Sequence, residues 1–118
     1  MQASLADQTC IPCKGGVPPL TAVEIAPLLA QLDGWEVPGD KRLKRMYRVK
    51  NFAEALALAN RIGAIAEQQQ HHPDLYVAWG HVGVEVWTHK IDGLTESDFV
   101  FAAKCDRAYA EDRAGVTT

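Results

Sequence analysis

Four histidines are the residues of this 118-residue chain best suited to chemistry, and all of them lie between positions 71 and 89. An imidazole titrates near pH ~6.5, so several converging imidazoles can hold acid and base forms together at neutral pH. His71 and His72 are adjacent at the expected end of a helix, where their side chains diverge by about 100 degrees. His89 falls near the end of a later strand, from which it could reach that helix end. These three residues predict an acid–base site.

Two carboxylates could serve these imidazoles. Glu67 stands four residues before His71, about one helical turn away, so it could orient that ring. Asp98 is close to the start of a later helix, a position more typical of a cap than of a catalytic carboxylate. Two other interpretations stay open for the histidines. A pair at a helix C-terminus often only complements the helix dipole, and a metal site is disfavoured because the spacing matches no zinc signature.

The elements that must position these residues are expected to alternate between helices and pairs of strands. Thr21 and Glu24 form a capping box before the first helix, which Pro27 is expected to kink or shorten. Two hairpins separated by a helix favour an α+β fold with one mostly antiparallel sheet and helices on one face. The expected elements are, in order, helix 21–33, strands 35–37 and 43–49, helix 51–70, strands 75–79 and 81–89, and helix 95–112.

Composition limits the class of protein. Hydrophobic residues make up 47% and charged residues 23%, which is typical of one soluble globular domain of this length. The net charge of −3 gives no global field that would attract nucleic acid or acidic membranes. No apolar run approaches ~18 residues, and no secretory signal is visible at the N-terminus. Three cysteines, an odd number, favour free thiols in a reducing cytoplasm. We therefore expect a cytoplasmic protein.

The chain divides into a domain and two tails. Residues 1–20 are rich in Gly and Pro without periodicity and are expected to form a flexible N-terminal tail. Cys10 and Cys13 form a CxxC there, but a structural zinc needs a second pair and a redox motif needs a flanking strand and helix. The domain is expected to span residues 21–113, followed by a C-terminal tail at 114–118.

A set of longer motifs is more specific than any single signal. The stretch 67–74 contains Glu-x3-His-His-Pro, 87–89 reads Trp-Thr-His, and 93–98 reads Gly-Leu-Thr-Glu-Ser-Asp. Together they closely resemble the pterin-4a-carbinolamine dehydratases. The pair at 34–35, Gly-Trp, sits where that family places a tryptophan, so the resemblance covers about residues 21–110. The N-terminal CxxC segment is absent from animal members and familiar in bacterial relatives, which implies a bacterial-type member.

The resemblance implies a fold and a reaction. The fold would be a single four-stranded antiparallel sheet with three helices on one face, in the order α-β-β-α-β-β-α. The substrate would be the 4a-hydroxytetrahydropterin that aromatic amino-acid hydroxylases leave behind. Loss of water gives quinonoid dihydropterin, which a reductase can recycle to tetrahydropterin. The family works without metal or cofactor.

The resemblance also implies roles for single residues. His71 and His89 resemble the general acids, and His72 resembles the histidine that holds the pterin. Trp35 resembles the aromatic residue that helps to wall the pocket. Glu67 and Asp98 resemble the accompanying carboxylates, which orient histidines or accept hydrogen bonds. His81 matches no catalytic position and is expected to face solvent.

Binding partners could be a second copy of the chain or a different protein. Animal members of this family also act as dimerisation cofactors for a homeodomain transcription factor, so a non-enzymatic interaction module is the alternative function. Phe99, Val100 and Phe101 place bulky apolar groups on more than one side of the last helix, which predicts a homodimer or homotetramer. An aromatic amino-acid hydroxylase is the implied functional partner, whereas nucleic acid and membranes are not expected to bind.

Overall fold

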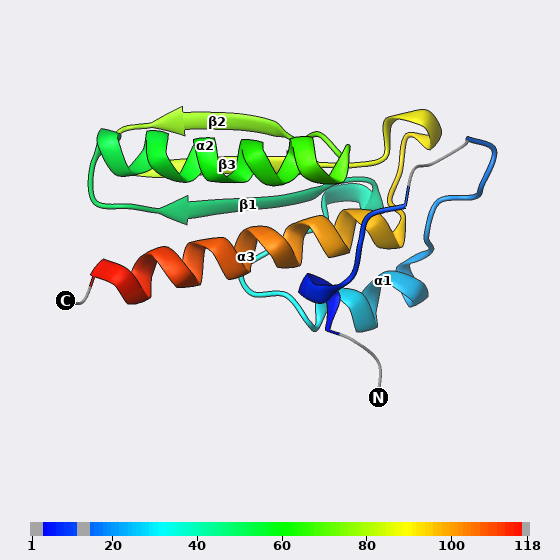
Figure 1. Ribbon diagram of the computed structural model, residues 1–118. Helices are drawn as coiled ribbons and strands as arrows, with labels where there is room; N and C mark the ends of the chain where they lie inside the picture. Colours follow the sequence, from blue (N-terminus) through cyan, green and yellow to red (C-terminus); the bar gives the residue numbers. More distant parts are fainter. Residues whose placement is uncertain (1–3, 12–14, 117–118) are drawn as a thin grey trace.

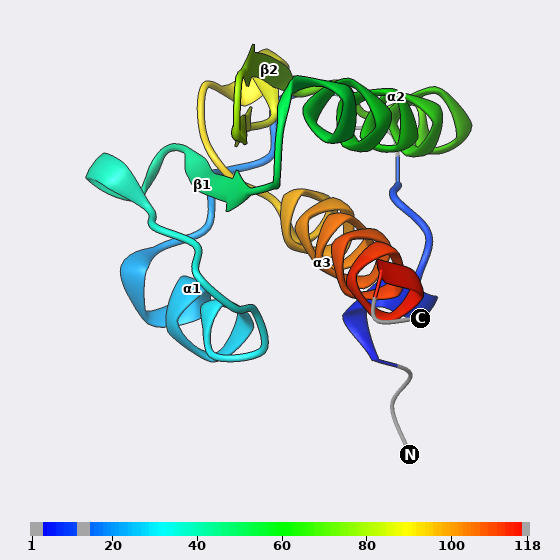
Figure 2. The same ribbon diagram turned by 90° about the vertical axis from the view of Figure 1, so that its left-hand side faces the viewer.

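The computed structural model describes residues 4–11 and 15–116, with side chains up to Arg113. Two long helices lie side by side on one face of a small antiparallel sheet, and a short helix flanks the second of them (Figures 1 and 2). The elements are α1 (Ala22–Leu29), β1 (Leu43–Arg48), α2 (Phe52–Gln69), β2 (Asp74–Ala78), β3 (His81–Val86) and α3 (Glu96–Val116), with 3₁₀ turns at Leu5–Asp7, Pro38–Asp40 and His89–Ile91. The α+β class is confirmed.

The sheet has three strands in the order β1-β3-β2, and both pairings are antiparallel. β3 is the central strand, and the valines at 82, 84 and 86 are buried on its helix-facing side. Partly exposed residues alternate with these valines along the strand. This period of two is the one expected when one face of a sheet is covered and the other is open.

The expected four-stranded sheet is wrong, because the segment Trp35–Val37 does not form a strand. It makes one isolated bridge to β1, in which the N–H groups of Glu36 and Lys44 each donate to the other's carbonyl oxygen at 2.8 and 2.9 Å. Gly34 before it has a φ of 77°. Pro38 after it lacks an N–H and begins a 3₁₀ turn. Only one residue pair therefore fits between these two backbone reversals.

Helix α1 begins as predicted and ends earlier than predicted. Thr21 and Glu24 form the full capping box, with the Thr21 side chain accepting from the Glu24 N–H and Glu24 accepting from the Thr21 N–H. Regular α-helix stops at Leu29, and the following N–H groups of Gln31 and Leu32 make tighter bonds three residues back. Pro27 lies inside this short helix and removes one hydrogen bond from it, which is why the helix was expected to be shortened.

Helix α2 has both of its predicted ends. Asn51 caps the start, its side chain accepting from the N–H of Glu54 at 2.9 Å. At the other end Gln70 adopts a left-handed conformation with φ of 52°. The N–H groups of Gln70 and His71 both donate to the carbonyl of Ala66, which closes the helix at its left-handed residue. The chain therefore leaves the helix axis immediately before the histidine pair.

Helix α3 is longer than the predicted 95–112 and continues to Val116. Phe99, Val100 and Phe101 are all buried within this single chain. They lie on several sides of the helix because α2, β1, α1 and the N-terminal 3₁₀ turn all contact α3. These residues therefore offer no free apolar surface, and a homodimer or homotetramer stays a prediction without that support.

The N-terminal residues 4–11 pack against α3 rather than extending away from it (Figure 1). Leu5 and Cys10 are buried in the core, and the ammonium of Lys104 donates to the carbonyl of Ala6 at 2.8 Å. Cys13, the second member of the CxxC, lies outside the described residues. The domain boundary at residue 21 stays a prediction, but residues 4–11 belong to the packed structure.

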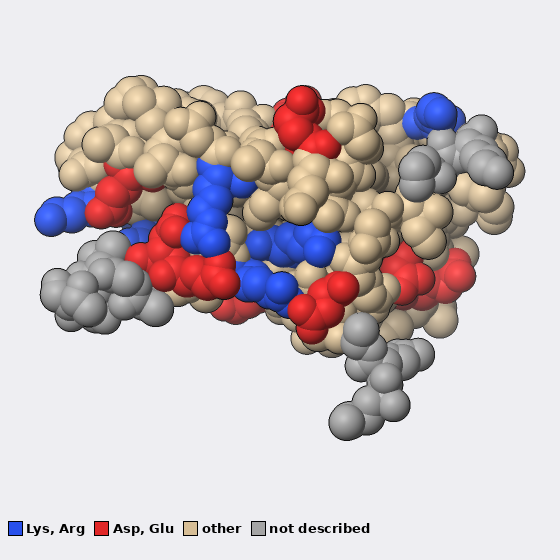
Figure 3. Space-filling model, in the orientation of Figure 1, with Lys and Arg blue, Asp and Glu red and all other residues tan. Residues whose placement is uncertain are grey.

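Two surface properties bear on partners. Lysine and arginine are interspersed with aspartate and glutamate on the face seen in Figure 3, without one dominant basic area. Among the described residues, no helix has both the length and the apolar character needed to cross a membrane.

Candidate functional site

The three predicted histidines border one pocket. His71 and His72 follow the turn that ends α2, and His89 opens the 3₁₀ turn after β3. This histidine pocket has a volume of about 320 Å³. The described residues that line it are Gln70, His71, His72, Trp87, Thr88, His89 and Lys90. A helix end and a strand end thus meet where the sequence suggested they could.

His71 is held by a buried carboxylate. Its Nε2 lies 2.6 Å from Oδ1 of Asp98, which is fully buried, while the His71 side chain is only 13% exposed. An ionised carboxylate can only accept hydrogen bonds, so Nε2 of His71 carries the proton of this contact. The neutral ring then has Nδ1 free of a proton and able to accept one.

Asp98 is both a helix cap and a partner of the site. Its Oδ2 accepts from the backbone N–H of Thr95 at 2.9 Å, the cap expected from its position at the start of α3. The same oxygen accepts from the hydroxyl of Thr88 at 2.8 Å, while Oδ1 contacts His71. The cap and the site interpretations of this residue are therefore compatible, because each uses a different oxygen.

Glu67 pairs with His72, so the expectation that it orients His71 is wrong. Its Oε2 lies 2.5 Å from Nε2 of His72, and both side chains are exposed, at 75% and 56%. The reason is the left-handed Gln70, which carries His71 away from the helical face that Glu67 shares. His72, five residues on, takes the place over Glu67 that a continuous helix would have given to His71.

His89 is supported by an aromatic ring. Its imidazole stacks on Trp87 with ring centroids 4.3 Å apart and an interplanar angle of 11°. The guanidinium of Arg42 also lies over the Trp87 ring at 4.2 Å and donates to Asp92 at 2.8 Å. That contact, mainly through its hydrogen bond, holds the pKa of Asp92 below its ordinary value. The sequence prediction missed Trp87, although strand alternation places Trp87 and His89 on the same face.

Trp35, predicted to wall the pocket, lies in the core instead. Its Nε1 donates to Oδ1 of Asp106 at 2.9 Å, and its ring meets Tyr47 edge-on at 6.2 Å. Tyr47 and Arg45 also donate to that oxygen, both at 2.6 Å. Trp35 is not among the described residues that line the histidine pocket. Trp87 is the indole found there.

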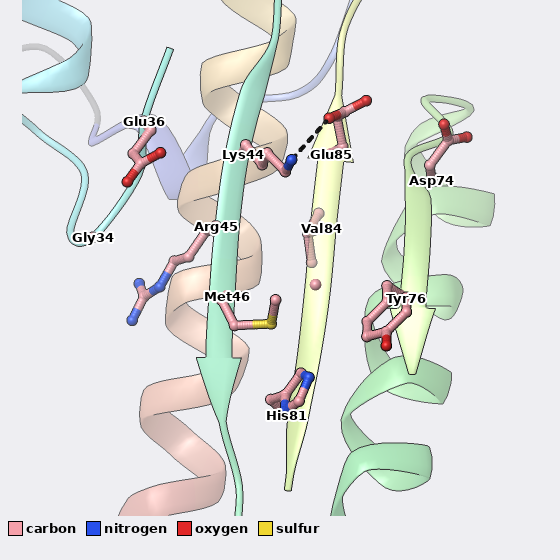
Figure 4. Close-up of a pocket in the computed structure, with 11 residues that line it drawn as sticks. Gly34, Glu36, Lys44, Arg45, Met46, Asp74, Tyr76, His81, Val84 and Glu85 are labelled. Atoms are coloured by element: carbon pink, nitrogen blue, oxygen red, sulfur yellow. Dashed lines mark ion pairs between the residues drawn. The ribbon is translucent and has the colours of Figure 1, made fainter. Parts of the chain in front are cut away.

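A larger hollow of about 730 Å³ lies on the open face of the sheet, with the helices behind it (Figure 4). Its surface includes Met46 and Tyr76 and an ion pair of 3.8 Å between Lys44 and Glu85. His81 lies here, partly buried and stacked on Tyr76 at 5.8 Å, rather than free in solvent. This hollow has one histidine among its described residues, whereas the smaller pocket joins three, two of them with carboxylate partners. The smaller pocket is therefore the better candidate for acid–base chemistry.

The described residues contain no group of three or more His, Cys, Asp or Glu side chains that could hold a metal ion. Cys10 and Cys105 are both free and buried.

Comparison with known proteins identifies the family. The model of the family described as pterin 4 alpha carbinolamine dehydratase matches residues 18–108, a stretch that includes every residue lining the histidine pocket. The chain belongs to this dehydratase family.

Relatives of this dehydratase family cover nearly the whole chain. A protein from Rubrobacter xylanophilus, provisionally named a pterin-4-alpha-carbinolamine dehydratase, is 57% identical over 89% of this chain and 98% of its own. A protein of the same name from Rickettsia bellii is 54% identical over 87% of this chain and 92% of its own. A crystal structure of a transcriptional coactivator/pterin dehydratase from Brucella melitensis has a TM-score of 0.72 at 33% identity, covering 77% of this chain and 98% of that one.

Proposed function

We propose that the histidine pocket removes water from 4a-hydroxytetrahydropterin to give quinonoid dihydropterin. One observation supports this above all: three imidazoles border a single pocket in a chain of the pterin carbinolamine dehydratase family. The reaction needs such groups, because hydroxide leaves poorly unless it is protonated and N5 of the pterin must lose its proton as the C=N bond forms. A pocket of about 320 Å³ is of the size that binds small planar ligands.

In this proposal His71 is the principal acid. With Nε2 bonded to Asp98, the protonated ring presents its second proton at Nδ1 to the departing hydroxyl. The buried carboxylate compensates the positive charge of the imidazolium before the transfer and fixes the ring afterwards. His89, held against Trp87, is the second acid–base group: it accepts the N5 proton and passes it to solvent, to which it is exposed. His72, oriented by Glu67, contacts the polar edge of the pterin.

The chemistry of the substrate suggests the setting of the reaction. A 4a-hydroxylated tetrahydropterin arises when an aromatic amino-acid hydroxylase uses tetrahydropterin and oxygen, and the dihydropterin product is a substrate for a reductase. We infer that this protein serves tetrahydropterin recycling beside such a hydroxylase. The proton transfers proposed for the pocket require imidazoles and water alone.

The test is the rate of quinonoid dihydropterin formation from freshly made carbinolamine. Wild-type protein should exceed the spontaneous rate, and His71→Ala and His89→Ala should each lose on the order of 100-fold. His81→Ala is the matched control, since it removes an imidazole that lines the larger hollow and not the histidine pocket. A wild-type rate equal to the spontaneous one would contradict the proposal.

A second candidate function is that of an interaction module acting on a partner protein. The observation that favours it is the Brucella melitensis neighbour, which is described as a transcriptional coactivator as well as a pterin dehydratase. Both functions are compatible with self-association into a homodimer or homotetramer. Light scattering at micromolar concentration measures this directly, and the mass of a single chain would refute it.

A further inference from the structure

The N-terminal residues Cys10 and Ile11 lie between the two elements that carry the buried histidine–carboxylate pair. One neighbour is Gln69, the last residue of α2, and the other is Ser97, in the first turn of α3. In Figure 1 the N-terminal segment runs alongside α3 up to the start of that helix. The segment is thus placed to connect α2 and α3 at the ends that face the histidine pocket.

Four hydrogen bonds make this connection. The N–H of Cys10 donates to Oε1 of Gln69 at 2.9 Å. The N–H of Ile11 donates to the hydroxyl of Ser97 at 2.8 Å, and that hydroxyl donates to the carbonyl of Ile11 at 3.2 Å. The thiol of Cys10 donates to the carbonyl of Ser97 at 3.4 Å. Burial raises the pKa of Cys10 to about 11, so the thiol keeps its proton for this bond at neutral pH.

The residues that Cys10 and Ile11 bind are neighbours in sequence of His71 and Asp98. Gln69 stands two residues before His71, and Ser97 immediately precedes Asp98. The 2.6 Å contact of the site joins the same two helix ends that Cys10 and Ile11 join. A shift of one helix end relative to the other would therefore stretch both sets of bonds together.

Cys10 and Ile11 are themselves anchored from the other side. Leu5 is buried, Lys104 donates to the carbonyl of Ala6, and Arg107 pairs with Asp7 at 2.5 Å. Cys10 and Ser97 are only 6% and 7% exposed, so water competes little for their bonds. The connection is thus fixed to the body of α3.

We propose that Cys10 and Ile11 form a positioning clasp that holds Asp98 at hydrogen-bonding distance from His71. The clasp touches no reacting atom and acts through the separation of the two helix ends. Its effect on turnover rests on the proposed dehydratase function. Its effect on the hydrogen bond between His71 and Asp98 does not.

The test uses a matched set of glutamine variants in the full chain. Gln69→Met keeps the length of the side chain and removes the acceptor for Cys10, whereas Gln69→Glu keeps an acceptor oxygen. Gln68→Met is the control, because Gln68 is an exposed neighbour on the same helix. Two quantities are measured: turnover of the carbinolamine, and the rate at which the Nε2 proton of His71 exchanges with water, followed by NMR.

Gln69→Met should lower kcat roughly tenfold with KM within about twofold, because a small displacement of a catalytic group costs rate rather than binding. The Nε2 proton should exchange roughly tenfold faster in this variant, as opening of the bond becomes easier. In Gln69→Glu, which keeps the acceptor oxygen, kcat and the exchange rate of the Nε2 proton should both stay within about twofold of wild type. Equal proton exchange in Gln69→Met and Gln68→Met would overturn the clasp.

Ser97→Ala gives an independent test, because it removes both bonds to Ile11 and leaves Gln69 intact. Faster exchange of the His71 proton is expected again, and unchanged exchange would overturn the proposal. If wild-type protein does not dehydrate the carbinolamine, the proposed function fails, while the exchange rates still decide whether the clasp exists.

Discussion

The two histidine–carboxylate pairs of the pocket have nearly the same length and very different surroundings. His71 and Asp98 are 2.6 Å apart with 13% and 0% of their side chains exposed, whereas His72 and Glu67 are 2.5 Å apart with 56% and 75% exposed. Water screens the exposed pair, and such pairs contribute only about 0–1 kcal/mol to stability. The buried pair is weakly screened and cannot lose one partner cheaply. Burial, rather than distance, distinguishes the two.

The pairs also differ in how they are assembled. Glu67 and His72 are five residues apart, Glu67 in the last turn of α2 and His72 just after the turn that ends it. His71 and Asp98 are separated by 27 residues and meet only when α2 and α3 are docked. The local pair can form wherever the helix forms. The distant pair reports the tertiary structure, which makes it the better candidate for a preorganised catalytic contact.

Asp98→Asn should produce the largest difference between the pairs. It removes the charge that faces His71 and places an amide where Thr88, Thr95 and His71 all need acceptors. We expect turnover to fall on the order of 100-fold. The free energy of unfolding, measured by urea denaturation, should fall by roughly 3 kcal/mol. Wild-type turnover in this variant would remove the reason for ranking the buried pair first.

Trp87→Leu should have an intermediate effect, because it tests His89, whose imidazole is stacked on the Trp87 ring. Loss of the stack frees the His89 ring and the Arg42 guanidinium, contacts worth about 0.5–1.5 kcal/mol each. We expect kcat to fall roughly tenfold, as for a loosened catalytic group. Trp79→Leu is the control, since that indole is 71% exposed at the hairpin. Equal kinetics in the two variants would show that the stack does not position His89.

Glu67→Gln should have the smallest effect. It repeats at the exposed pair the chemical change made by Asp98→Asn, a carboxylate replaced by its amide. Because water already screens Glu67, the free energy of unfolding should change by less than about 0.5 kcal/mol, and turnover by about twofold. A loss as large as that of Asp98→Asn would mean that the exposed pair is the catalytic one.

The local features of the fold could be predicted from the sequence. The capping box at Thr21 and Glu24, the cap at Asn51 and the end of α2 near Gln70 are confirmed. Each depends on residues within one turn of one another, so the sequence carries the whole interaction. The family was identified correctly for a similar reason, since its motifs are continuous stretches.

The errors concern features that depend on small backbone departures. A fourth strand was expected at Trp35–Val37, but a reversal at Gly34 and a proline at Pro38 leave room for one bridge. Glu67 was assigned to His71, because helical spacing was extended one residue past the left-handed Gln70. Gly34 and Gln70 each have a positive φ, and each changes the path of the chain at the point where the prediction fails.

The sequence by itself determined which residues could do acid–base chemistry, where the helices begin, and to which family the chain belongs. Only the tertiary structure decided that Asp98 serves His71, that Trp87 rather than Trp35 borders the pocket, and that Cys10 bonds to both α2 and α3. The reason is that a hydrogen bond or a ring stack requires atoms within a few ångströms. Side chains far apart in sequence reach that distance only through the docking of whole elements, which no local pattern encodes.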